Sequence, residues 1–203
     1  PIQFQESVHC LAYVLYLLAA LRGSLAATLP AGVGVDARSM PYSPPNPEAY
    51  PCVVDGRCEY RLSLGRLTVE GLTHFKRGAR WTKRRVLRGR ADGEPFVLEA
   101  DYLESGKYLR INGVDQGWEA SSSSYAAVLA TAGHWWRSVP AMELMRGVYP
   151  NPRLAWLAFQ LSGVLWRSSH EQRPIEVPTL EALDRFDSGY RAARPHLPRY
   201  ESR

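Results

Sequence analysis

The sequence contains little cysteine. Its three cysteines, Cys10, Cys52 and Cys58, are too few for the disulfide framework that holds many small secreted domains together. No CxxC pair, cysteine–histidine cluster or N-x-[ST] glycosylation acceptor occurs. We therefore expect an intracellular, reducing compartment. A basic chain that begins with proline instead of methionine favours an organelle such as the mitochondrion.

The motifs of common enzymes are also missing. The five histidines lie at least 26 residues apart in sequence, and there is no HExxH zinc motif, GxSxG elbow or phosphate-binding P-loop. The Gly32-Val-Gly34 segment resembles part of a dinucleotide-binding fingerprint, but it follows an expected helix and runs into prolines instead of opening a helix. We predict no catalytic residue, no metal ligand and no cofactor, and we lean against an enzyme.

Acidic residues are fewer than basic ones. The 203 residues include 25 lysines and arginines and 20 acids, for a net charge of +5 and an isoelectric point near 9.3. Such a charge is compatible with nucleic acid, an anionic membrane surface or an acidic protein as partner, and it selects none of them. With 45% hydrophobic residues, the chain is long enough and apolar enough to fold around a substantial core.

Two apolar segments, 8–29 and 154–166, are the candidates for buried helices. Residues 10–21 are apolar or aromatic at every position, so this helix has no polar face and must lie in a core or in lipid. Arg153 and Arg167 bracket the second segment. Residues 10–21 and 154–166 are each short for the roughly 30 Å hydrocarbon layer of a bilayer, and 8–29 reaches that length only by including Arg22 and Gly23. We favour core helices, and keep membrane contact through 8–29 and 154–166 as the alternative.

Between the first helix and the next segment lies a proline-rich stretch. Pro30 to Pro51 contains six of the 15 prolines, and such a stretch favours extended conformation and disfavours the interior of a sheet. We predict a linker or arm over 30–56. If the arm lies across a partner, Tyr42 and Tyr50 are its candidate anchors.

The middle of the chain, 57–119, predicts a six-stranded antiparallel meander. Three two-residue turns punctuate it, at Gly65-Arg66, Asp92-Gly93 and Asn112-Gly113, and each is typical of a tight hairpin. The implied registers place Leu62 opposite Val69, Leu87 opposite Leu98, Ile111 opposite Val114, and an arginine opposite an acid in each hairpin: Arg61 with Glu70, Arg84 with Asp101, and Arg110 with Asp115. We expect the meander to be open, curled or a half-barrel.

The remainder, 120–194, predicts three to four helices, followed by an extended tail over 195–203. The last helix begins at Pro178-Thr179 and carries Leu180, Leu183, Phe186 and Tyr190 on one stripe. Together these segments predict an α+β fold in which an apolar N-terminal helix (1–29) and the C-terminal helices cover the meander. The whole is expected to be one compact domain with arms.

A run of basic residues over 74–90 is the candidate nucleic-acid surface. It interleaves cations with aromatic side chains, as single-strand binders do. Acids on the returning strand offset part of this charge, so a solvated or protein-facing hairpin is the preferred interpretation. The candidate contact residues here are Arg77, Arg80, Trp81, Arg88 and Arg90.

Three hypotheses for function follow. The preferred one is a non-catalytic accessory or structural subunit of a larger assembly, bound to other protein subunits and associated with membrane as a further option. Trp156 and Trp166 are its candidate contacts, because tryptophan is enriched at interface hot spots. The alternatives are a nucleic-acid-binding protein that uses 74–90, and a small-ligand-binding or enzymatic domain with a pocket in the meander.

Overall fold

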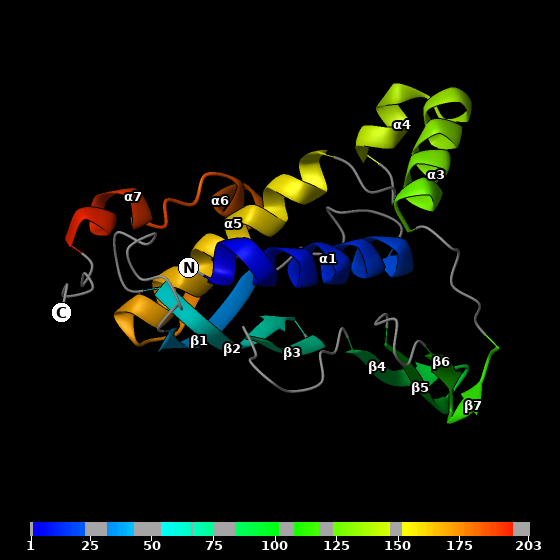
Figure 1. Cartoon of the computed structure of the whole chain (residues 1–203), viewed down its shortest axis with the longest axis horizontal. Helices are drawn as coiled ribbons and strands as arrows, with labels where there is room; N and C mark the ends of the chain where they lie inside the picture. Colours follow the sequence, from blue (N-terminus) through cyan, green and yellow to red (C-terminus); the bar gives the residue numbers. More distant parts are fainter. Residues whose placement is uncertain are drawn as a thin grey trace. The chain divides into compact units, whose positions relative to one another are not determined.

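The structure is a computed structural model. It describes residues 2–22, 32–42, 54–65, 67–74, 84–101, 108–117, 124–146 and 152–196. Two compact units emerge (Figure 1): unit 1 comprises Pro1–Phe75 with Val139–Arg203, and unit 2 comprises Lys76–Ser138. Helices and two antiparallel sheets make up the described residues, which confirms the predicted α+β class.

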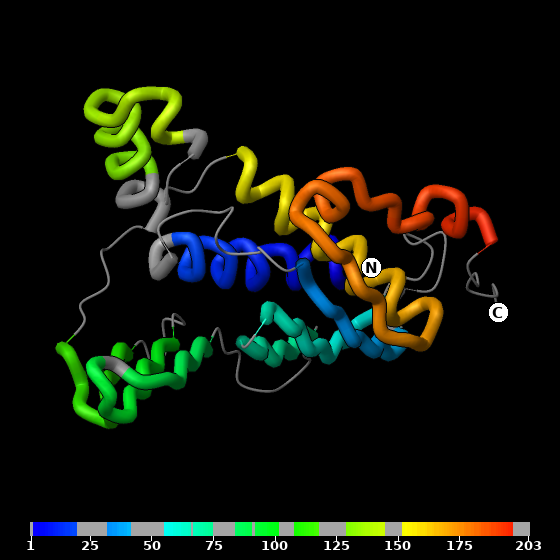
Figure 2. The backbone as a smooth tube through the Cα atoms, turned by 180° about the vertical axis from the view of Figure 1, so that it is seen from behind, coloured from blue at the N-terminus to red at the C-terminus, as the bar shows by residue number. Residues whose placement is uncertain are grey.

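Unit 1 contains one four-stranded sheet and most of the helices. Its elements in chain order are η1 (Gln3–Ser7, a π-helix), α1 (Val8–Arg22), β1 (Val33–Tyr42), β2 (Val54–Leu64), β3 (Leu67–His74), α4 (Ala141–Arg146), α5 (Pro152–Glu171), β8 (Ile175–Val177), α6 (Leu180–Asp184), α7 (Tyr190–Ala193) and the 3-10 turn η4 (Arg194–His196). The strand order is β3-β2-β1-β8, so β1 is an interior strand. Figure 2 shows the same path from behind.

The position of β1 corrects the predicted linker over 30–56. Its side chains alternate between buried and exposed, with Val33, Val35 and Ala37 facing inward. Pro41 is tolerated because it lies at a register shift, and because β8 pairs only with the first three residues of β1. The other five prolines of the stretch lie outside the described residues.

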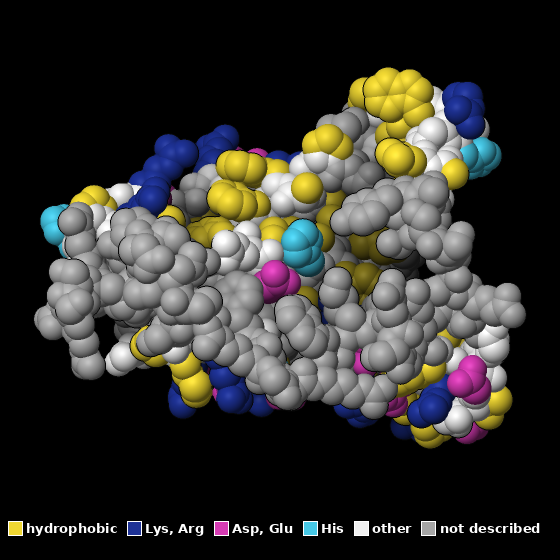
Figure 3. All heavy atoms as spheres, in the orientation of Figure 1, with side chains coloured by type: hydrophobic (Ala, Val, Ile, Leu, Met, Phe, Trp, Pro, Cys, Tyr) yellow, Lys and Arg dark blue, Asp and Glu magenta, His cyan; other side chains and the backbone are white. Residues whose placement is uncertain are grey.

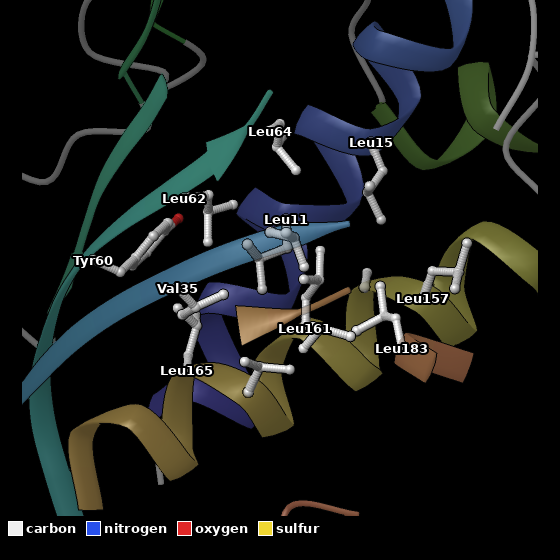
Figure 4. Packing of buried hydrophobic residues seen from close by; sticks show 14 of the residues in the cluster. Leu11, Leu15, Val35, Tyr60, Leu62, Leu64, Leu157, Leu161, Leu165 and Leu183 are labelled. Carbon is white, nitrogen blue, oxygen red and sulfur yellow. The ribbon is translucent and has the colours of Figure 1, made fainter. Parts of the chain in front are cut away.

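Helices α1 and α5 cover one face of this sheet. In its first half α5 buries one stripe, at Leu154, Leu157 and Ala158, and from Gln160 to Trp166 every residue is buried. Figure 4 shows apolar side chains of α5 meeting side chains of α1, β1 and β2, among them Leu11, Val35, Leu62, Leu161 and Leu165, all 0–1% exposed. Burying each such side chain contributes about 1.5–3 kcal/mol. α1 and α5 are therefore both core helices, and no helix in the described part of the chain is long and apolar enough to cross a membrane.

A buried serine joins α5 to the sheet. The Oγ atom of Ser168 accepts a hydrogen bond from the backbone N–H of Ala37 at 3.0 Å and donates to the carbonyl oxygen of Arg173 at 2.8 Å. Ser168 thus gives the buried N–H of Ala37 on β1 a partner and connects it to the chain beyond α5.

Unit 2 contains the second sheet. Its elements are β4 (Arg84–Ala91), β5 (Glu94–Asp101), β6 (Tyr108–Ile111), β7 (Val114–Asp115) and α3 (Ser124–Ser138). The strand order β4-β5-β6-β7 is sequential. Asp92 and Asn112 have positive φ angles of 51° and 49°, and each is followed by a glycine with positive φ, which is the geometry that tight hairpin turns require.

All three predicted hairpins and their registers are confirmed. Leu62 pairs with Val69, Leu87 with Leu98 and Ile111 with Val114. The single six-stranded meander is wrong in detail, because the six strands after residue 54 divide between two sheets. The sequence has no hairpin-turn motif between β3 and β4, and these two strands belong to different sheets. Strands β1 and β8 complete the first sheet. Each sheet is open and has two edge strands among those described.

The last predicted helix is interrupted. Thr179 caps α6 as expected, accepting a hydrogen bond from the N–H of Ala182 at 3.0 Å. After α6, the side chains of Asp187 and Ser188 accept hydrogen bonds from the backbone N–H groups of Gly189 and Tyr190. Such local bonds compete with helix formation, and Gly189 at φ 72° breaks the helix.

Candidate functional site

No reactive centre emerges among the described residues. Within them, no group of three or more His, Cys, Asp or Glu side chains is arranged to hold a metal ion. Cys58 is fully buried, and burial raises the pKa of its thiol to about 12, against the opposing effect of a hydrogen bond with Ser39. Because the thiolate is the nucleophile, Cys58 remains an unreactive thiol at neutral pH.

The polar groups around Cys58 fasten the N-terminal π-helix to the sheet. Gln3, which is fully buried, donates from Nε2 to Ser39 and to Asp55 Oδ2, and Ser169 donates to Ser39 at 2.6 Å. The Oε1 atom of Gln3 has no partner within the described residues. This cluster connects η1, β1, β2 and α5, and its role is structural.

Two open hollows lie on the surface of unit 1. The larger, about 550 Å³, lies on the exposed face of the first sheet, and the smaller, about 420 Å³, lies between α5 and the segment before α7. Both are lined by charged groups that already pair with one another, for example Arg61 with Glu70 at 2.7 Å and Arg167 with Glu171 at 2.6 Å. Small-ligand sites are mostly apolar with a few convergent polar groups. Neither hollow has that character.

The basic hairpin is described only in part, because Arg77, Arg80 and Trp81 lie outside the described residues. Arg88 and Arg90 are exposed on β4, and the Nε of Arg90 donates to the carbonyl oxygen of Gly93 at 2.9 Å.

Arg84 on the same strand pairs with Glu99 at 2.7 Å, although its backbone partner is Asp101 as the sequence predicted. The hydroxyl of Tyr108 also donates to Glu99, at 2.7 Å, and the guanidinium of Arg110 lies 4.5 Å from the Tyr108 ring centre. The hydrogen bond from Arg84, followed by that from Tyr108, lowers the pKa of Glu99. This sheet face therefore carries a network of exposed charges around one carboxylate.

The most distinctive surface of unit 1 is a row of four aromatic side chains, which we call the aromatic ledge: Phe4, Trp156, Phe159 and Tyr190. Trp156 and Phe159 are 45% and 46% exposed. The ring centres of Trp156 and Phe159 are 6.1 Å apart, those of Phe159 and Phe4 5.4 Å, and those of Phe4 and Tyr190 5.2 Å. Figure 3 shows hydrophobic side chains at the surface over α5 and α6, next to basic ones.

Hydrogen bonds hold Trp156 in place. Its indole N–H donates to Asp184 Oδ1 at 2.8 Å, and Asp184 also forms an ion pair with Arg153. The side-chain amide of Gln160 donates to the carbonyl oxygen of Asp184 at 2.7 Å. The ring is therefore fixed by α5 and α6 while nearly half of it faces outward.

The two tryptophans predicted as contacts differ in their exposure. Trp156 lies on the surface, whereas Trp166 is only 4% exposed and packs between His170 and Tyr190. The ring of Trp166 therefore belongs to the core. Tyr50 lies outside the described residues, as does the side chain of Tyr42 at the end of β1.

Sequence reasoning missed three members of the ledge. Phe159 lies three residues after Trp156, on the same helix face, and this spacing could have identified it. Phe4 and Tyr190 are distant in sequence from α5, and they join the ledge only through tertiary packing.

Comparisons with known proteins give little further guidance. Neither a protein-family model nor a curated protein matches the sequence. Among solved structures, this chain is similar to an NAD-binding protein from Listeria innocua, with 11% identity and a TM-score of 0.45 over 91% of this chain and 49% of that one. The chain therefore spans about half the length of that protein, and a likeness this distant carries no argument about function.

Proposed function

We propose that this chain is a non-catalytic subunit of a larger protein assembly, and that it docks on another protein through the aromatic ledge. The observation that carries the proposal is the Trp156–Phe159 pair, two stacked aromatic rings that are each nearly half exposed, with Trp156 hydrogen-bonded to Asp184. Isolated exposed hydrophobic side chains are common, but a contiguous aromatic surface on a soluble domain is typical of an interaction site.

The rigidity of the ledge favours tight binding. A side chain that is already fixed loses little conformational entropy when a partner covers it, and this saves about 0.5–1.5 kcal/mol per ordered side chain. The hydrogen bond from Trp156 to Asp184 also satisfies the only polar atom of the indole. The outward part of the ring can therefore be buried without leaving a donor unpaired.

The proposal is tested by measuring the size of the tagged protein in extracts of the cells from which it comes. We expect the native chain to elute in a complex well above its own 22.8 kDa. The Phe159→Ser variant, and separately Trp156→Ser, should release it, because hot-spot residues contribute about 2 kcal/mol or more, close to a thirtyfold change in affinity. Phe159 makes no side-chain hydrogen bond, so its variant should fold normally.

Leu72→Ser is the matched control. Leu72 is 52% exposed, like the ledge residues, but lies on β3, away from α5 in the sequence and on the other face of the sheet. Its variant should remain in the complex. Elution of the native chain at 22.8 kDa, or equal behaviour of the ledge and control variants, would contradict the proposal.

A further inference from the structure

Helix α3 in unit 2 has an apolar face that the described residues leave uncovered. Trp136 is 82% exposed and Leu129 is 72% exposed, the two highest values among the large hydrophobic side chains of the described residues. They are seven residues apart, which places them on the same face of a helix. Figure 3 shows hydrophobic side chains at the surface of α3, next to a basic and a histidine side chain.

The side of α3 opposite Leu129 carries polar side chains among alanines, and the helix contains no acid. Thr131, His134 and Ser138 follow each other at helical spacing on the side opposite Leu129, and Arg137 lies in the last turn. No Asp or Glu occurs anywhere between residues 124 and 138. The helix is thus amphipathic and carries no negative charge.

The unit that contains α3 also carries most of the net charge of the protein. Lys76–Ser138 contains eleven lysines and arginines and seven acids, a net charge of +4, whereas the residues of unit 1 contain 14 and 13, a net charge of +1. A charge asymmetry of this kind favours an extended anionic partner for the basic part.

We propose that α3 lies on an anionic lipid surface. Its 15 residues correspond to about 22 Å of helix, too short to span a bilayer but suited to lying in the plane of the interface. In that position Leu129 and Trp136 enter the boundary between headgroups and acyl chains, and Arg137 reaches the phosphates. The described parts of the two apolar segments, α1 and α5, contribute side chains such as Leu11 and Leu161 to the core.

The absence of acid on α3 and the charge of unit 2 favour lipid over the other partners. An anionic bilayer offers negative charge and an apolar layer at the same place, which matches a basic unit with exposed Leu129 and Trp136. A nucleic acid offers the charge but no acyl layer for an exposed leucine. The inference is independent of the aromatic ledge, which lies on unit 1.

The test is sedimentation of the full chain with vesicles of phosphatidylcholine alone and of phosphatidylcholine mixed with phosphatidylglycerol. We expect binding to the mixed vesicles only, weakening as salt is added because screening reduces the attraction. Leu129→Ser and Trp136→Ser should each reduce binding about tenfold, since each removes a side chain that would be buried in lipid. Both positions are exposed, so neither variant should disturb folding.

Leu72→Ser is the control, because it removes an exposed hydrophobic side chain from unit 1, outside the aromatic ledge, and should bind vesicles like the native chain. The proposal is overturned if the native chain does not bind the mixed vesicles, or if Leu129→Ser and Trp136→Ser bind them as well as the control does. Binding of a single-stranded oligonucleotide without vesicle binding would also overturn it and would assign unit 2 to nucleic acid.

Discussion

Unit 1 and unit 2 differ in how many hydrophobic side chains they bury. Every residue of the hydrophobic core cluster belongs to unit 1, where α1 and α5 close over a sheet. In unit 2, Ala100 is the one hydrophobic residue of the described set that is fully buried, and other apolar side chains of its sheet, such as Leu87, Leu98 and Ile111, remain partly exposed.

The difference concerns what stabilises each unit. Unit 1 is stabilised by burial of apolar surface, which requires contacts between residues far apart in sequence. Unit 2 is stabilised by two-residue turns and by cross-strand pairs, which are local and contribute about 0.2–1 kcal/mol each. A unit of that kind retains apolar and charged surface for a partner, which is consistent with the exposure of Leu129 and Trp136.

The largest expected effect comes from truncating one leucine in the sheet or helices of each unit. Leu161→Ala should lower the free energy of unfolding by about 2–5 kcal/mol, because it leaves a cavity between α5 and the sheet. Leu98→Ala in β5 should cost about 1 kcal/mol or less, since that side chain is only partly buried. Urea unfolding of the two variants measures the difference, and equal losses would show that unit 2 has a core of its own.

A pair of glycines provides a second comparison. A Cβ atom at Gly71 on β3 would come within 2.0 Å of the Tyr60 ring, which packs across from it, whereas at Gly89 on β4 a Cβ meets nothing within 4 Å. Gly71→Ala should therefore destabilise the protein by about 1–3 kcal/mol through overpacking.

Gly89→Ala is the matched control for that change. It should be neutral or stabilise by up to about 1 kcal/mol, because alanine restricts the unfolded chain without a clash in the folded one. Thermal unfolding of both variants measures the contrast. A Gly71→Ala protein that is as stable as the Gly89→Ala protein would mean that the Tyr60 ring can move aside at little cost.

The same difference explains how much of the fold could be predicted from the sequence. The hairpins were predicted to the residue, because Asp92-Gly93 and Asn112-Gly113 specify their own geometry and the alternation of side chains fixes the register. The membership of the sheets was not predicted. β1 pairs with β2 and with β8, which lies more than 130 residues later in the sequence, and no local pattern indicates that pairing.

The candidate site shows the same limit. Exposure depends on tertiary packing, so the sequence could nominate Trp156 and Trp166 together but could not separate the exposed ring from the buried one. The apolar character of 8–29 and 154–166 likewise identified buried helices, but it could not decide what buries them. Helices α1 and α5 pack against each other and against strands β1 and β2, which buries both.

The smallest expected effect concerns one carboxylate in each unit, Glu171 on α5 and Glu99 on β5. A hydrogen bond from Arg167 lowers the pKa of Glu171, and one from Arg84 lowers that of Glu99. A carboxyl group whose pKa is lower in the folded state stabilises the fold above its ordinary value of 4.5. That contribution is lost as the pH falls through the lowered folded-state value. Both groups lie at the surface, so each effect is small and decreases with added salt.

Glu171→Gln and Glu99→Gln make this prediction specific to each unit. Each variant should be slightly less stable than the native chain at neutral pH, and its stability should fall less steeply under acid conditions. Amide hydrogen exchange, followed residue by residue against pH, should place the effect of Glu171→Gln in α5 and that of Glu99→Gln in β4 and β5. Glu176→Gln, at an exposed position on β8, is the control and should leave both profiles unchanged. If either variant altered protection equally in both units, the two units would unfold together, and the local stability of the hairpins could not be what sets unit 2 apart.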